Sequence, residues 1–205
     1  MRQDFHFWLT ILARGFVALV AGSAILIVPD LARTLLLLPI ALAVAITGLA
    51  AYGVVDSVLV FVSSFMIKLS AATVALRFQG FVGVGIGLLL LSVVYDHVQL
   101  KWFLSLAAIQ ALCAGVAETI VARHTTDRSI GRWNYSTAAI AFVFAILYVY
   151  LRIHADDLTP RQLSWSLYAY LVALGIAECI TAARMLYANE HSDMKHLSAA
   201  VGTGA

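Results

Sequence analysis

The sequence predicts an all-α integral membrane protein with six transmembrane helices, arranged as three repeated helical hairpins. Of its 205 residues, 62% are hydrophobic and only 12% are charged, and the mean hydropathy is +0.94. Soluble domains carry charge on about a quarter of their residues, so this composition excludes an ordinary soluble fold. A short phrase, glycine followed three positions later by a carboxylate, occurs at 53–56, 115–118 and 175–178. A spacing of about 60 residues indicates one hairpin unit used three times.

Six apolar stretches are long enough to cross a bilayer, because about 20 helical residues span about 30 Å of hydrocarbon. They are expected at 8–28, 35–55, 77–95, 102–122, 134–151 and 163–183. Pro29 and Asp30 are expected to end the first span, which is too long for the apolar core of a cleaved signal peptide. We expect one transmembrane domain over 1–188, with hairpin repeats at 8–68, 71–123 and 132–188, and a flexible cytoplasmic tail at 189–205.

Lysine and arginine are distributed unequally between the two predicted faces. The face with both termini holds Arg2, Arg14, Lys68, Arg77, Arg123, Arg128, Arg132, Arg184 and Lys195. The opposite face holds Arg33, Lys101, Arg152 and Arg161. By the positive-inside rule, both termini are therefore expected in the cytoplasm. The net charge of +2 is small and the basic residues are dispersed, so no nucleic-acid partner is expected.

Three carboxylates and two arginines are predicted to share one depth in the membrane. Asp56, Glu118 and Glu178 fall in the cytoplasmic half of the even-numbered spans, and Arg14 and Arg77 fall in the same half of odd-numbered ones. An unpaired charge costs about 2.5–3.5 kcal/mol at the centre of a membrane helix, so pairing is favourable. We predict ion pairs of Asp56 with Arg14 and of Glu118 with Arg77.

The third carboxylate has no equally deep basic partner in the sequence. Arg184 follows Glu178 by about a turn and a half, and its side chain is expected to extend toward the interface. Two interpretations of the charged residues remain. Either they hold the hairpins together, or they line a path for protons or ions. The first is favoured because the acids lie near the interface and nothing comparable is visible in the opposite half.

Glycines are dense in the first half of the third predicted span. Gly83 and Gly87 are four residues apart, a spacing that lets two helix backbones approach closely in a membrane. The alternative is the general small-residue content of membrane helices.

The sequence contains no pattern that predicts catalysis. It lacks a nucleophile elbow, a phosphate-binding glycine loop and paired helical histidines, so neither an enzyme nor a cofactor is expected. Cys113 and Cys179 lie in apolar stretches and are interpreted as packed thiols. A metal site formed by His191, Asp193 and His196 is the weaker alternative, because a flexible tail offers no fixed geometry. No metal site is therefore predicted.

Several glycines and charges carry a resemblance to a known family. The first repeat has Arg14, Gly15, Gly22, Pro29, Asp30, Gly53 and Asp56, and the second has Arg77, Gly80, Gly87, Gly115 and Glu118. These residues resemble the repeats of the HdeD-like acid-resistance membrane proteins, and the resemblance extends to about Tyr187. The third repeat departs from the pattern, because Ala138 and Ala145 stand where the glycines would be.

The resemblance implies a six-helix protein of the bacterial inner membrane that is linked to acid stress and has no established catalytic residues. Our leading expectation is accordingly a non-enzymatic protein with a role in acid or envelope stress. Two alternatives are kept: a small proton- or ion-conducting protein, and an accessory subunit of a larger membrane complex. Beyond the lipid bilayer, the expected partners are a second copy of the chain or another membrane subunit.

The predicted outward-facing turns contain two histidines among balanced charges. Four acidic and four basic residues balance there. The acids are Asp30, Asp96, Asp156 and Asp157, and the bases are Arg33, Lys101, Arg152 and Arg161. Free histidine titrates near about 6.5 and aspartate near about 3.9, so acid would make this face strongly positive. His97 and His154 are therefore candidate pH-responsive residues, although any protein with short balanced loops would respond similarly.

Overall fold

The computed structural model describes residues 7–35, 38–65, 70–93, 100–125 and 127–202, and this part of the chain is helical without a strand. Six long helices are joined by short connections, one of which contains a 3-10 turn. The helices are α1 (Phe7–Leu35), α2 (Leu38–Ser63), α3 (Ser70–Val93), α4 (Leu100–His124), α5 (Arg128–Ile153) and α6 (Pro160–Gly202), with the 3-10 turn at Ala155–Asp157.

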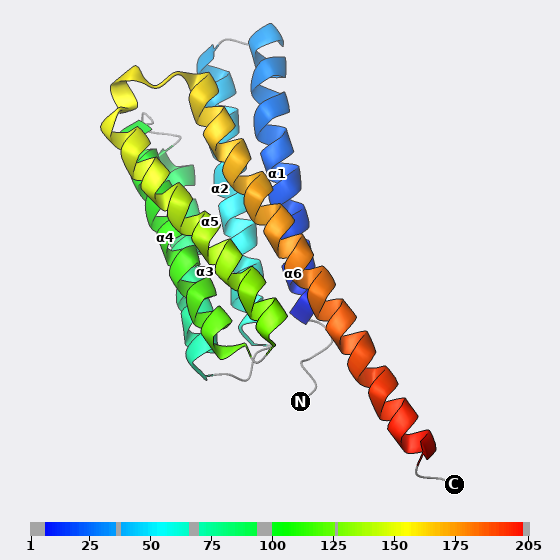
Figure 1. Cartoon of the computed structure of the whole chain (residues 1–205). Coiled ribbons are helices and arrows are strands. Elements are labelled where there is room, and N and C mark those ends of the chain that lie inside the picture. Colours follow the sequence, from blue (N-terminus) through cyan, green and yellow to red (C-terminus); the bar gives the residue numbers. More distant parts are fainter. Residues whose placement is uncertain (1–6, 36–37, 66–69, 94–99, 126, 203–205) are drawn as a thin grey trace.

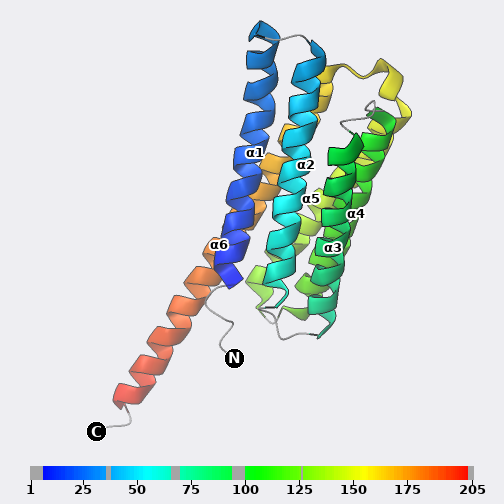
Figure 2. The ribbon, with the colours of Figure 1, turned by 180° about the vertical axis from the view of Figure 1, so that it is seen from behind.

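The helices form a closed ring in chain order. Each long helix packs against the next one, and α6 returns to pack against α1. Figures 1 and 2 show the resulting elongated bundle from opposite sides, with the beginning of α1 and the end of α6 at the same end. An even number of antiparallel helices gives this arrangement. Which side of a membrane that end faces stays a prediction.

The protein is a multi-pass membrane protein by the length and composition of its helices. Within the described residues, five segments are long and apolar enough to span a bilayer: Phe7–Ile27, Ala71–Leu91, Leu100–His124, Arg128–Ile153 and Arg161–Ala188. A shorter apolar segment, Ala50–Ser63, belongs to α2. Large apolar side chains such as Phe81 and Ile146 are exposed on the outside of the bundle, where lipid would cover them.

Close helix contacts occur where glycine removes the side chain. A Cβ atom built on Gly15 of α1 would lie 2.9 Å from the carbonyl oxygen of Gly175 on α6. A Cβ built on Gly80 of α3 would lie 2.9 Å from the carbonyl oxygen of Ser57 on α2, and Gly87 also faces α2. Glycine is therefore required for the backbones to approach this closely. The predicted role of the third span's glycines in helix packing is confirmed for Gly83, which lies against Ser57 of α2, and for Gly87.

Most helices extend beyond their predicted spans, and the differences are most consequential at the ends of the first and last helices. The first helix was expected to end at Pro29 and Asp30, but α1 continues to Leu35. Proline is tolerated in membrane helices because neighbouring groups can satisfy the freed backbone carbonyl. At the other end, α6 is helical to Gly202 and projects past the bundle, so the segment at 189–202 is helical along its backbone. The flexibility of this tail stays a prediction.

Candidate functional site

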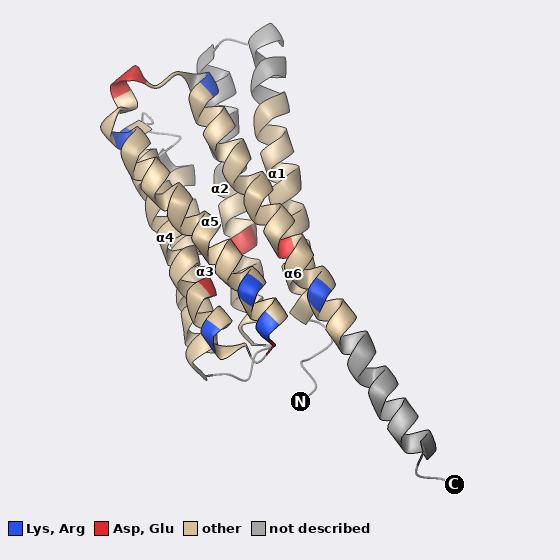
Figure 3. Cartoon of the chain, viewed as in Figure 1, with Lys and Arg blue, Asp and Glu red and all other residues tan. Residues whose placement is uncertain are grey.

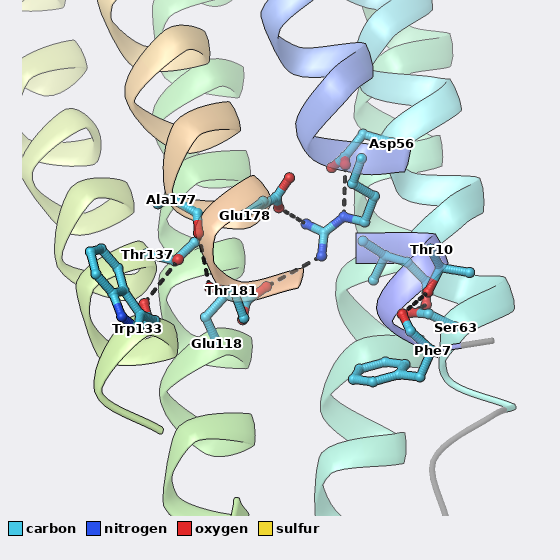
Figure 4. A network of polar contacts seen from close by, with 12 residues as sticks. Phe7, Thr10, Asp56, Ser63, Glu118, Trp133, Thr137, Ala177, Glu178 and Thr181 are labelled. Atoms are coloured by element: carbon cyan, nitrogen blue, oxygen red, sulfur yellow. Dashed lines mark hydrogen bonds and ion pairs between the residues drawn. The ribbon is translucent and has the colours of Figure 1, made fainter. Parts of the chain in front are cut away.

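Arg14 of α1 contacts three carboxylates from three other helices. Its Nε atom lies 2.9 Å from Oδ1 of Asp56 on α2, and Nη1 lies 3.4 Å from Oε1 of Glu118 on α4. Its Nη2 atom lies 2.9 Å from Oε1 of Glu178 on α6. Figure 4 shows the three labelled carboxylates arranged around one guanidinium group. We call these four residues the Arg14 cluster.

The Arg14 cluster lies inside the helix ring. Helices α2 and α6 both pack against α1, whereas α4 lies on the other side of the ring, so the contact with Glu118 crosses the interior. Exposed fractions are 5% for Arg14, 7% for Asp56, 8% for Glu118 and 3% for Glu178. Figure 3 shows the described acidic residues of α2, α4 and α6 in the same half of the bundle, as the sequence predicted.

The charges of the Arg14 cluster do not balance. With every group ionised, three carboxylates and one guanidinium carry a formal charge of −2. The two remaining helices add no charge to the cluster, since α3 contributes Gln79 and α5 contributes Asn134 and Thr137 to the adjoining cavities. Arg14 is also the only buried lysine or arginine side chain in the described part of the chain. Uncompensated buried charge is costly, so the cluster needs further positive charge.

The predicted pair of Asp56 with Arg14 is confirmed, whereas the predicted pair of Glu118 with Arg77 is wrong. Arg77 is exposed, and its guanidinium carbon lies 4.5 Å from the centre of the Phe65 ring. The polar residue of α3 that lines the interior is Gln79, two positions further along. Two residues correspond to about 200° around a helix, which turns Arg77 toward the outside.

Glu178 also differs from the expectation that it lacks a deep basic partner, because it shares Arg14 with the other two carboxylates. Arg184 is exposed and is not part of the Arg14 cluster. The contact between Arg14 and Glu178 is an ion pair without hydrogen-bond alignment. Neither carboxylate oxygen of Glu178 has a hydrogen-bond partner within the described structure.

Two cavities adjoin the Arg14 cluster. The central cavity has a volume of about 50 Å³ and is bounded by Asp56, Glu118 and Arg14 together with Tyr52 and Tyr148. Tyr148 lies about three turns of α5 from Thr137, so this cavity extends about 16 Å along the bundle. The lower cavity has a volume of about 20 Å³ and adjoins the cluster on its other side. Beyond the carboxylates, the described wall of the central cavity continues with the hydroxyl groups of Tyr52 and Tyr148 and holds no further acid.

The lower cavity lies toward the end of the bundle where α1 begins. Phe7 and Ile11 line it together with Glu178 and Thr181. Arg14, Glu118 and Thr137 line both cavities, so the Arg14 cluster lies between them.

Three polar residues in the wall of the central cavity were not identified from the sequence. The hydroxyls of Tyr52 and Tyr148 and the Oε1 atom of Gln79 are buried and have no hydrogen-bond partner within the described structure. A sequence signal for Gln79 does exist, because it directly precedes Gly80 as Arg14 directly precedes Gly15. The tyrosines have no comparable signal.

The other candidate residues lie away from the cluster. His154 is exposed, and its Nδ1 atom lies 3.1 Å from the carbonyl oxygen of Tyr150, while His97 lies outside the described residues. Cys113 and Cys179 are free, half-buried thiols, so they are only partly packed. The side chains of the tail histidines, His191 and His196, are also outside the described part. Within that part, no group of three or more His, Cys, Asp and Glu residues is arranged to hold a metal ion.

The fold and the Arg14 cluster together define a multi-pass helical membrane protein with a charged site in its interior. Comparison of the chain with protein-family models, with curated proteins and with solved structures finds no match. The resemblance to HdeD-like proteins therefore stays an expectation, and functional inference rests on the site itself.

Proposed function

We propose that this chain is a non-enzymatic protein of the bacterial inner membrane that binds protons in its interior and acts in the acid or envelope stress response. The observation that carries the proposal is the sharing of one guanidinium by three buried carboxylates. An ion pair needs one carboxylate for each arginine. The two additional carboxylates are suited to a site whose charge is completed by protons.

Glu178 is the carboxylate best placed to accept a proton. Both of its oxygens lack a hydrogen-bond donor, and the side chain is only 3% exposed. The adjoining lower cavity of about 20 Å³ is large enough for about one water molecule, since a water needs about 10–15 Å³ by this measure. Such a water could deliver a proton to Glu178 and remove it again. Asp56, in contrast, receives a hydrogen bond from Arg14 Nε.

A structural role of the cluster is compatible with this proposal. Arg14 links α1 to α2, α4 and α6, and removing one member of a buried ion pair leaves the other uncompensated. The pairs therefore favour one arrangement of the helices. Protonation of a carboxylate would weaken its attraction to Arg14, which couples acidity to helix packing.

The proposal includes three hairpin repeats, which explain how the imbalance arises. The even-numbered helices would contribute Asp56, Glu118 and Glu178 at equivalent positions. The odd-numbered helices would contribute Arg14, Gln79 and Thr137, each directly before a small residue. These six residues all line the two cavities, which supports their equivalence. Only the first repeat would then carry a base, whereas all three carry an acid.

We place both termini in the cytoplasm because of the distribution of lysine and arginine. The lower cavity would then lie toward the cytoplasm, and the central cavity would extend toward the periplasm. Acid entering from outside would reach the Arg14 cluster through the central cavity. This arrangement supports an acid-linked role, as does the resemblance noted above.

Survival of a deletion strain at low pH tests the proposal. We expect deletion to reduce survival, the wild-type gene to restore it, and a variant with Glu118→Gln and Glu178→Gln, which keeps Asp56 paired with Arg14, to fail despite normal membrane levels. Asp157→Asn, which changes an exposed turn residue, is the matched control and should restore survival. Normal survival of the deletion strain would remove the stress role. Full rescue by a His97→Ala, His154→Ala variant would exclude only sensing by these histidines.

A further inference from the structure

We propose that the central cavity is a binding site for a small ammonium-type cation, either ammonium itself or a short primary amine in its protonated form. The inference rests on the same excess of buried carboxylate as the proposed function. It adds the chemical class of a ligand. That class is inferred from the buried polar atoms of the cavity wall that have no hydrogen-bond partner.

The hydrogen-bonding groups of the cavity wall can accept hydrogen bonds, so they favour a ligand that donates them. Gln79 contributes an amide oxygen that can only accept, and this oxygen has no donor within the described structure. The hydroxyls of Tyr52 and Tyr148 are also without partners, and each can accept as well as donate. The three residues are 7%, 8% and 1% exposed, respectively. The three groups are spread along a cavity of about 16 Å, so N–H donors bound at different levels of it would satisfy them.

The charge of the cavity calls for a cation. Asp56 and Glu118 form part of its wall, and Arg14 is the only base there. A cation bound beside the carboxylates would therefore take over part of the compensation that protons otherwise provide. The described residues do not present three or more ligands arranged for a metal ion. Hydrogen-bond donation is accordingly a better basis for recognition than metal coordination.

The shape of the cavity limits the ligand to a small one. A volume of about 50 Å³ corresponds to roughly four water-sized volumes. Apolar side chains of Val82, Leu90 and Leu171 complete the wall and can contact a short alkyl group. Tyr170 also lines the cavity, and its ring lies edge-on to that of Tyr148 with centres 5.9 Å apart. Aromatic rings of this kind attract cations.

The thermal stability of the purified protein in lipid nanodiscs tests the inference. Ammonium chloride and methylammonium chloride would be compared with potassium chloride and sodium chloride at equal ionic strength. Potassium is the matched control because its size is close to that of ammonium but it has no N–H donors. A ligand that binds only the folded state raises Tm. We expect a saturable rise in Tm with the two ammonium salts and none with potassium or sodium.

Two variants connect the effect to the cavity. Gln79→Leu removes the orphaned acceptor at similar size, and Tyr148→Phe removes only a hydroxyl, so it serves if the first variant does not fold. Each should reduce the ammonium-dependent rise, whereas Tyr150→Phe, at an exposed position of the same helix as Tyr148, should keep it in full.

An equal rise with all four salts, or a rise that both cavity variants retain in full, would overturn the inference. The absence of any rise would also overturn it. Proton binding is measured separately, by infrared spectroscopy without amine, so the proposed function can stand when the ammonium site fails.

Discussion

The Nη2 atom of Arg14 on α1 lies 2.9 Å from Oε1 of Glu178 on α6, so an ion pair joins the first and last helices in the interior of the bundle. The same two helices touch nearby, where Gly15 meets Gly175. Backbone contact and ion pair thus occur at adjacent positions of α1. Together they close the helix ring.

Replacing Arg14 should destabilise the protein more than replacing any other arginine. Arg14→Gln leaves three buried carboxylates without a base, and breaking a buried ion pair costs about 3–5 kcal/mol. Arg77→Gln is the matched control, because Arg77 is exposed and lies outside the Arg14 cluster. We expect a large fall in Tm for the first variant and a small one for the second, measured in the same detergent. Equal losses would show that Arg14 is not the central residue.

Neutralising Glu118 should be well tolerated. Its contact with Arg14 is the longest of the three, at 3.4 Å, and Glu118→Gln removes one of two surplus negative charges. We expect a free energy of unfolding within about 1 kcal/mol of the wild type, since a glutamine can retain a hydrogen bond to Arg14. Equilibrium unfolding in mixed detergent measures it. A loss as large as that of Arg14→Gln would contradict a surplus of negative charge.

Much of the fold could be predicted from the sequence because hydrophobicity and length determine membrane helices directly. The shared depth of Asp56, Glu118 and Glu178 also followed from span positions. Rotation about the helix axis did not, because nearly every side of these helices is apolar. Arg77 was therefore placed on the inner face, where Gln79 lies, and the sharing of Arg14 was missed. Tyr52 and Tyr148 could not be identified, since tyrosine is also common at membrane interfaces.

Alanine at Gly80 should weaken the packing of α3 against α2. The added Cβ would lie 2.9 Å from both the Ser57 carbonyl oxygen and the Phe61 Cβ, and overpacking of this kind costs about 1–3 kcal/mol. Gly85→Ala on the same helix is the control, because nothing lies within 4 Å of its added Cβ. Thermal unfolding should separate the two variants. A harmless Gly80→Ala would mean that the helices are further apart than described.

Reporter fusions should place the two ends of the bundle on opposite sides of the membrane. Six spans and the basic-residue distribution together predict periplasmic signals for fusions at Asp30, Gln99 and Asp157. Fusions at Ser70 and Thr126 should give cytoplasmic signals, as should a fusion at the C-terminus. A single firmly reversed position would refute this topology.

Proton binding by the Arg14 cluster is the central claim, and infrared difference spectroscopy tests it most directly. Protonated carboxylic acids give a carbonyl band that carboxylates lack. As pH is lowered, the wild type should show this band. Glu178→Gln should reduce it, and the combined Glu118→Gln, Glu178→Gln variant, which keeps Asp56 paired with Arg14, should remove it. Asp157→Asn should leave the cluster band unchanged. Identical spectra of the wild type and the combined variant would contradict the claim.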